Sequence, residues 1–158
     1  MRYLLDTNTY IYWATDQDLL DVDVYDLLNE PDAMLCISAE SVRELIVAYN
    51  AKGWGNKRWK TAEDMVNAIE QDYYIEILPI GKEVMQTYSR LRINTAMNHK
   101  DPSDHVIIAH AMTLGMPLIS SDAAAKTPAT VTTAPTTGPR LHLQREVAPR
   151  HIFPSPKE

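Results

Sequence analysis

Arg2-Tyr3-Leu4-Leu5-Asp6, near the start of the chain, is a largely apolar segment that ends on a carboxylate. Short apolar runs that lie between turn residues predict buried β-strands. Three later segments have the same character: Met34 to Ile37, Ile75 to Leu78 and Pro117 to Ser120. The sequence therefore predicts four strands, the first of which places Asp6 at its carboxyl end.

Helical patterns lie between these strands. Thr61 and Asp64 have the spacing of a capping box, and Gly115 suits the end of the last helix. Strands that alternate with helices imply parallel pairing through right-handed crossovers, with helices on both faces of the sheet. We therefore expect an open, three-layer α/β/α fold. The predicted helices run from Ser38 to about Ala51, from Thr61 to about Tyr73, from Gly81 to Ile93 and from Ser103 to Leu114.

The composition suits one domain. A length of 158 residues and a hydrophobic content of 45% are enough for one continuous core. No apolar run approaches the ~20 residues of a membrane span, so we expect a cytoplasmic protein without a membrane partner. Cys36 is the single cysteine and lies in an apolar segment, which predicts a buried thiol and excludes a disulfide framework.

The formal net charge of −6 at first argues against a nucleic-acid partner, because Lys and Arg drive phosphate binding. Carboxylates that hold divalent cations count as negative in this sum, yet they present positive charge once the ions are bound. The net charge therefore does not exclude a metal-dependent nuclease.

Residues 123–158 differ in character from the rest of the chain. They hold six of the ten prolines and show no apolar period, and their net charge is +3, whereas residues 1–122 carry −9. This composition predicts a low-complexity, disordered tail that follows a single folded domain over residues 1–122.

Four acids are expected to meet at one edge of the sheet. Ligands of an open parallel sheet bind beyond the carboxyl ends of its strands, and Asp6 and Asp122 each follow a predicted strand. Asp104 lies in the first turn of its helix, in line with inward-facing apolar residues, and Glu44 lies on the inward-leaning side of an earlier helix. Acids placed in this way repel one another, and a divalent cation relieves that repulsion.

Oxygen ligands favour Mg²⁺ or Mn²⁺ over zinc. His99, His105 and His110 do not change this expectation, because the last two are five residues apart and fall on different helix faces. Such ions promote phosphodiester hydrolysis by activating water and stabilising the leaving oxygen. Taken singly, each of the aspartates is more often a helix N-cap than a metal ligand. Their joint placement at one sheet edge is what favours a site.

Hydroxyl and amide side chains next to these acids are expected to support them. Thr7 and Asn8 suit the cap of the first helix and the orientation of the acid before them. Ser120 and Ser121 precede the last acid and suit the same task there. A purely structural role is equally compatible with all four side chains.

The segment from Lys52 to Lys60 interleaves cations with two tryptophans. That pattern is typical of a surface that binds phosphates and stacks bases, so Lys57, Arg58 and Lys60 are candidate RNA contacts. Contact with a partner protein is equally compatible with the pattern, and a solvated loop is a third interpretation.

Four motifs carry the candidate acids: Leu4-Leu5-Asp6-Thr7-Asn8, Ile37-Ser38-Ala39-Glu40-Ser41-Val42-Arg43-Glu44-Leu45, His99-Lys100-Asp101-Pro102-Ser103-Asp104-His105-Val106-Ile107-Ile108-Ala109-His110-Ala111 and Leu118-Ile119-Ser120-Ser121-Asp122. In this order and spacing they resemble the PIN-domain family, and more narrowly the VapC-type toxins of type II toxin–antitoxin modules. The resemblance spans residues 1–122.

This resemblance implies a PIN-like fold and a site. It identifies Asp6, Glu44, Asp104 and Asp122 as an acidic quartet that holds Mg²⁺ or Mn²⁺, with Asp101 as a nearby auxiliary acid. It further implies a metal-dependent endoribonuclease that cuts structured RNA. The partners it implies are a second copy of the chain, in a homodimer, and a small cognate antitoxin whose C-terminal segment covers the site.

Two features depart from the family pattern. His105 stands where these proteins usually carry Arg, and residues 123–158 lack the short helix and final apolar strand that normally follow the last acid. A frameshift would explain the second departure. With synonymous codons chosen for the purpose, the segment from Thr137 to Val147 read one base later encodes an apolar, strand-like string. The nucleotide sequence of the gene around codon 123 tests this hypothesis.

Two other functions stay open at this point. Asp6-Thr7-Asn8-Thr9 after a strand loosely resembles the phosphatases of the haloacid dehalogenase type, which need a second acid where Asn8 stands. Those enzymes also need a later acid pair that Asp122-Ala123 does not supply. The other alternative is a catalytically impaired PIN-like binding module, since the altered tail leaves the predicted sheet incomplete. Metal-dependent cleavage of RNA by the purified protein separates this module from a nuclease.

Overall fold

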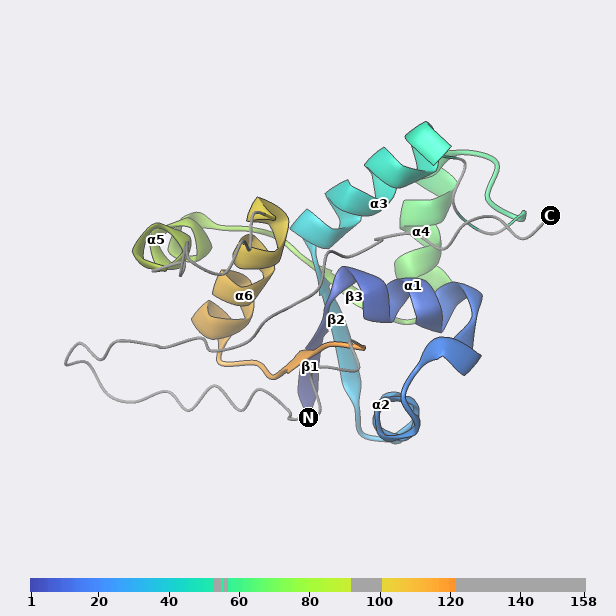
Figure 1. Ribbon diagram of the computed structural model, residues 1–158, viewed down its shortest axis with the longest axis horizontal. Helices are drawn as coiled ribbons and strands as arrows, with labels where there is room; N and C mark the ends of the chain where they lie inside the picture. Colours follow the sequence, from blue (N-terminus) through green and yellow to red (C-terminus); the bar gives the residue numbers. More distant parts are fainter. Residues whose placement is uncertain (53–54, 56, 92–100, 122–158) are drawn as a thin grey trace.

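A four-stranded parallel sheet forms the centre of the computed structural model, which describes residues 1–52, 55, 57–91 and 101–121 (Figure 1). Its strands are β1 (Arg2–Leu5), β2 (Met34–Ser38), β3 (Glu76–Leu78) and β4 (Leu118–Ile119). They lie in the order β3-β2-β1-β4. All four predicted strands are confirmed, although β3 and β4 are shorter than the apolar runs that predicted them.

Helices cover both faces of this sheet. They are α1 (Thr7–Thr15), the 3₁₀ helix η1 (Gln17–Leu19), α2 (Val22–Leu28), α3 (Ala39–Lys52), α4 (Ala62–Gln71), α5 (Lys82–Arg90) and α6 (Pro102–Leu114). Figure 1 shows α5 and α6 on one side of the sheet and α1 to α4 on the other. The predicted three-layer α/β/α fold is thereby confirmed.

The local signals in the sequence account for several helix ends. Thr61 and Asp64 form the predicted capping box at the start of α4, and Gly115 closes α6 in the left-handed conformation at φ 61°. The predicted helix over Gly81 to Ile93 ends at Arg90, and residues 92–100 lie outside the described residues. The tail over residues 123–158 also lies outside them. Within the described part of the chain, none of the helices combines the length and the apolar character that crossing a membrane requires.

Successive residues of each strand pack into different halves of the core. Leu5 and Ile37 belong to the larger cluster, which includes apolar side chains of α1, α3 and α4, whereas Leu4 and Cys36 pack with Ile107 of α6. The strands therefore consist of continuous apolar residues, as expected of a parallel sheet that is buried on both faces. The thiol of Cys36 is buried, as predicted, and burial raises its pKa.

The strand register places Asp6 where a ligand is expected. Leu5 pairs with Ile37 of β2 and with Ile119 of β4, so Asp6 follows β1 at the carboxyl edge of the sheet. From β1 the chain adds β2 and then β3 on one side, and it later returns to add β4 on the other side. Asp6 therefore lies at the topological switch point, which is where open α/β sheets bind their ligands.

Candidate active site

Asp6 lies at the junction of β1 and α1. Its backbone is extended (φ −73°, ψ 167°), and its Oδ1 accepts a hydrogen bond from the backbone N–H of Thr9 at 2.7 Å, so Asp6 is the N-cap of α1. The prediction that Thr7 and Asn8 cap this helix is wrong, because both residues are already inside its first turn. The residue with the extended backbone supplies the cap. As a result, α1 itself orients the carboxylate of Asp6.

The end of β4 is tied to the same corner. The backbone N–H of Asp6 donates to the carbonyl of Ile119 at 2.9 Å, and the hydroxyl of Thr9 donates to the same carbonyl at 3.2 Å. Ser120 and Ser121 follow directly and are half-buried. The end of β4 therefore lies beside Asp6, whereas Asp122 lies outside the described residues.

Glu44 of α3 reaches the start of α1. The hydroxyl of Thr7 donates a hydrogen bond to Oε2 of Glu44 at 2.5 Å. Glu44 is half-buried, and its pKa is raised to about 7. Burial is the main cause, and the negative charges of Asp101, Asp104 and Glu40 add to it, while the hydrogen bond from Thr7 opposes the shift. This carboxylate is therefore in a position where a nearby cation would favour its ionised form.

Asp101 and Asp104 lie at the start of α6. Oδ1 of Asp101 accepts a hydrogen bond from the backbone N–H of Ser103 at 3.0 Å, which makes Asp101 the N-cap of the helix. Asp104 is half-buried in the first turn, close enough to Glu44 to raise its pKa. Both side chains lie at the positive end of the helix dipole, where negative charge is placed favourably.

The donor set fits a hard divalent cation in its chemistry, because it consists of carboxylate oxygens, and the charges of Asp101 and Asp104 help to raise the pKa of Glu44. In addition, the buried hydroxyls of Ser41 and Ser121 have no hydrogen-bond partner within the described residues. Across the same residues, which do not include Asp122, no group of three or more His, Cys, Asp and Glu side chains is arranged to hold a metal ion. Glu44, Asp101 and Asp104 are thus close enough to interact electrostatically, but the described residues alone do not form a complete set of metal ligands.

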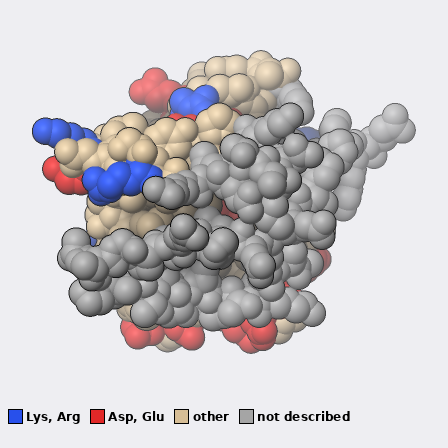
Figure 2. Space-filling view, turned by 60° about the vertical axis from the view of Figure 1, so that its left-hand side comes forward, with Lys and Arg blue, Asp and Glu red and all other residues tan. Residues whose placement is uncertain are grey.

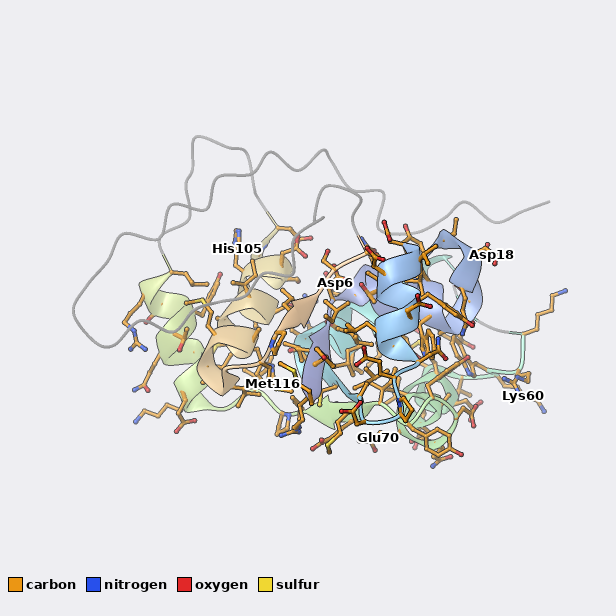
Figure 3. The ribbon with its side chains drawn as sticks, turned by 90° about the horizontal axis from the view of Figure 1, so that it is seen from below. Asp6, Asp18, Lys60, Glu70, His105 and Met116 are labelled. Carbon is orange, nitrogen blue, oxygen red and sulfur yellow. The ribbon has the colours of Figure 1, made fainter. Side chains whose placement is uncertain are left out.

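The histidines are dispersed. His110 is buried in α6, and its Nδ1 is 2.9 Å from the hydroxyl of Ser38 at the end of β2. Burial lowers the pKa of His110. His105 lies half-buried near the start of α6, and His99 lies outside the described residues. Figure 3 shows His105 on a different element from Asp6, which lies nearer the centre of the molecule.

Three polar side chains that the sequence did not single out join α3 to α6; we call them the Glu40–Arg43–Ser103 bridge. Nη2 of Arg43 donates to Oε1 of Glu40 at 2.6 Å and to Oγ of Ser103 at 2.9 Å. Oγ of Ser103 in turn donates to Oε1 of Glu40 at 2.7 Å. The spacing of Glu40 and Arg43 on one helix predicts an ion pair, whereas nothing local links either residue to Ser103.

The basic loop, Lys57, Arg58 and Lys60, is exposed. The interpretation that its aromatic residues stack bases is wrong for Trp59, which is 6% exposed and belongs to the hydrophobic core. Figure 3 shows Lys60 at the right-hand end of the molecule and His105, which lies on α6 with Asp104, in the left half. The loop therefore does not line the corner that holds the acids.

The raised pKa of Glu44 predicts a pH dependence of stability. Between about pH 4.5 and 7 the folded protein keeps a proton on Glu44 that the unfolded chain releases, so this contribution to stability is lost as the pH rises through that window. We expect Glu44→Gln to gain stability relative to the wild type across the same window and to keep a constant advantage above it. Urea unfolding in the presence of a chelator measures this difference. A difference that does not change with pH would contradict the assigned pKa.

The comparisons with known proteins give one family and a group of similar folds. The PIN domain family model matches residues 3–129. A chain of VapBC2 from Rickettsia felis, solved with a DNA fragment from its promoter, is 20% identical, with a TM-score of 0.54 over 76% of this chain and 87% of that chain. FitAcB from Neisseria gonorrhoeae is 24% identical, with a TM-score of 0.53 over 77% of this chain and 88% of that one.

A toxin–antitoxin complex from Klebsiella pneumoniae is 17% identical, with a TM-score of 0.50 over 80% of this chain and 92% of that one. At these identities the likeness is one of fold. No match was found among curated proteins.

Proposed function

The chain belongs to the PIN domain family, and we propose that it is a metal-dependent endoribonuclease, the toxin of a toxin–antitoxin pair. The observation that supports this proposal is the position of Glu44. Its carboxylate accepts a hydrogen bond from Thr7, the residue after Asp6, and the neighbouring acids help burial to raise its pKa to about 7. Such a gathering of acids at the switch point of a parallel sheet suits a divalent cation. The family match gives no support to the phosphatase alternative.

We assign the metal to Asp6, Glu44, Asp104 and Asp122, with Mg²⁺ or Mn²⁺ as the ion. When bound, such an ion supplies the Lewis acid that phosphodiester hydrolysis needs. The contribution of the other residues of the chain is to orient the carboxylates of the proposed ligands. The N–H of Thr9 holds the carboxylate of Asp6, and the hydroxyl of Thr7 holds that of Glu44. Asp101 caps α6 and so steadies the turn that carries Asp104.

The charge distribution indicates where RNA does not bind. Residues 16–32 hold seven acids and no Lys or Arg, so the surface of η1 and α2 repels phosphates. Figure 2 shows Asp and Glu side chains in patches along its lower border, and at its upper left it shows Lys and Arg side chains beside further acids. We propose RNA as the substrate, with the basic loop as a contact remote from the acids.

Metal dependence is the direct test of this function. We expect the purified protein to cut RNA in Mg²⁺ or Mn²⁺, to stop when excess EDTA is added and to resume when the metal is restored, because all four proposed ligands are carboxylates. Gel analysis of a folded RNA before and after chelation measures this. Full activity in excess chelator would contradict the metal mechanism. Binding of RNA without any cleavage in either metal would favour the catalytically impaired binding module.

The basic loop gives a second prediction. Replacing Lys57, Arg58 and Lys60 by Ala should weaken RNA binding and flatten its salt dependence, by a slope of up to about 0.7 to 0.9 for each phosphate that the loop no longer neutralises. Fluorescence anisotropy at several salt concentrations measures the slope, with Lys82→Ala, an exposed lysine of α5, as the control. An unchanged slope would assign the loop to protein contacts or to none.

We also propose an antitoxin and a second copy of the chain as partners. Toxin–antitoxin complexes are among the solved structures that share this fold. Loss of RNA cleavage on addition of a candidate antitoxin tests the first partner, and light scattering of the purified chain tests the second. A monomer at all concentrations would contradict the homodimer.

A further inference from the structure

We propose that Arg43 is a positioning residue: through the Glu40–Arg43–Ser103 bridge it sets the separation of Glu44 and Asp104 and thereby the affinity of the chain for a divalent cation. This inference rests on the proposed metal site. It assigns no catalytic step to Arg43, which contributes by holding two helices in register.

The bridge joins the two helices that carry these acids. Arg43 immediately precedes Glu44 on α3, and Ser103 immediately precedes Asp104 on α6. The hydrogen bond of 2.9 Å from Nη2 of Arg43 to Oγ of Ser103 therefore connects the neighbours of two proposed ligands. We therefore expect a change in this bond to move the two carboxylates relative to each other.

The bridge is well suited to this task because it is closed and partly buried. Glu40 accepts hydrogen bonds from both Arg43 and Ser103, and Nε of Arg43 lies 3.2 Å from each carboxylate oxygen of Glu40. Ser103 is 6% exposed. The planar guanidinium offers several donors in a fixed geometry, which an ammonium group does not.

A second tie fixes the start of α3 to the same helix. The hydroxyl of Ser38 accepts a hydrogen bond from the backbone N–H of Glu40 at 3.2 Å, and it lies 2.9 Å from Nδ1 of His110 in α6. With α3 held at its start by this contact, the bridge controls the neighbouring turn. The two ties together define how α3 and α6 lie against each other near the acids.

Arg43 could also affect cation affinity through its positive charge alone, without any effect on the separation of the two helices. The pKa of Arg43 is raised, first by its hydrogen bond to Glu40 and further by the charges of Glu44 and Asp101, so the guanidinium also offsets acid repulsion. Two variants separate charge from geometry. Arg43→Lys keeps the positive charge and removes the fork, and Ser103→Ala removes the bridging hydroxyl without changing any charge.

Titration of the full chain with Mn²⁺, in the absence of RNA and followed by calorimetry, tests the proposal. Groups that orient metal ligands typically contribute about 10–100-fold to affinity. We therefore expect Arg43→Lys and Ser103→Ala each to weaken Mn²⁺ binding by about 10-fold or more. The double variant should bind no more weakly than the weaker single variant, because both changes break one bridge.

Thr113→Val is the matched control. Its hydroxyl also links α6 to another helix, since it donates to the hydroxyl of Thr87 in α5 at 2.8 Å, but it lies at the far end of α6. We expect this variant to bind Mn²⁺ like the wild type even where it loses as much thermal stability as Ser103→Ala. If Ser103→Ala does not fold, Arg43→Lys alone tests the proposal, because the Arg43 side chain is largely exposed and its replacement should leave the fold intact.

The outcomes are distinguishable. Wild-type protein that binds no Mn²⁺ would overturn the proposed metal site and this inference with it. Mn²⁺ binding that is unaffected in both Arg43→Lys and Ser103→Ala would overturn the inference and leave the metal site standing. Equal weakening in Thr113→Val would also overturn it, because general loosening of α6 would then account for the effect.

Discussion

Asp6→Asn is expected to lower metal-dependent RNA cleavage by about 100-fold or more, because groups that only orient a metal ligand already contribute about 10–100-fold and Asp6 is proposed as a ligand itself. The fold should survive, since Asn caps helices about as well as Asp and can accept the same hydrogen bond from the N–H of Thr9. Cleavage rates and urea unfolding, measured on the same preparation, separate the two effects.

Asp21→Asn is the control for this change. Asp21 is also an N-cap aspartate, and its carboxylate accepts a hydrogen bond from the N–H of Asp23 at 3.2 Å at the start of α2. This substitution removes the same charge from the same type of position, away from the proposed ligands. We expect wild-type cleavage from it. Wild-type cleavage by Asp6→Asn as well would remove Asp6 from the proposed site.

The sequence predicted the strands because this sheet is covered on both faces. Leu4 and Leu5 point into different halves of the core, so β1 appears as a continuous apolar run rather than as an alternating one. α2 was not predicted, since it has only seven residues, of which Leu28 alone is fully buried. Short elements whose burial depends on their neighbours carry little periodicity of their own.

The arrangement of the candidate site could be predicted only where the end of a strand determines the position of a residue. A carboxylate directly after an apolar strand of a parallel sheet lies at the carboxyl edge, and Asp6 does so. The hydrogen bond from Thr7 to Glu44 and the bridge from Arg43 to Ser103 were not predictable, because each depends on how two helices pack. The distance between α3 and α6 is a property of the assembled core rather than of either segment.

For Trp59 the sequence pattern suggested a functional surface where the structure has a core residue. Its cationic neighbours in the sequence suggested a nucleic-acid surface, yet its ring packs in the core beside Gly55. Gly55 has φ 138°, and a Cβ at that position would lie 2.6 Å from the Trp59 ring. Amphipathic residues next to charges are therefore ambiguous in sequence, and the close approach of the Trp59 ring leaves no room for a side chain at Gly55.

Leu5→Ala is expected to cost about 2–5 kcal/mol of unfolding free energy, the range for removing a large aliphatic side chain from a rigid core. Leu5 is 0% exposed, and its strand neighbours Ile37 and Ile119 belong to the same buried cluster, so little can move to fill the space. Leu114→Ala is the matched control, because Leu114 of α6 is 46% exposed and should cost less than about 1 kcal/mol. Urea unfolding of the three proteins measures both changes.

Because Leu5 immediately precedes Asp6, this substitution also tests whether the core holds the site in place. A loss of about 2–5 kcal/mol is a large part of the roughly 5–15 kcal/mol that stabilises a domain, so assays need a temperature at which the variant remains folded. At such a temperature we expect Mn²⁺ affinity to fall as well. The start of α1 orients Asp6, and only Asp6 separates this helix from the end of β1. An unchanged affinity would mean that the hydrogen bonds of Asp6 to Thr9 and Ile119 fix its carboxylate without help from the side chain beneath it.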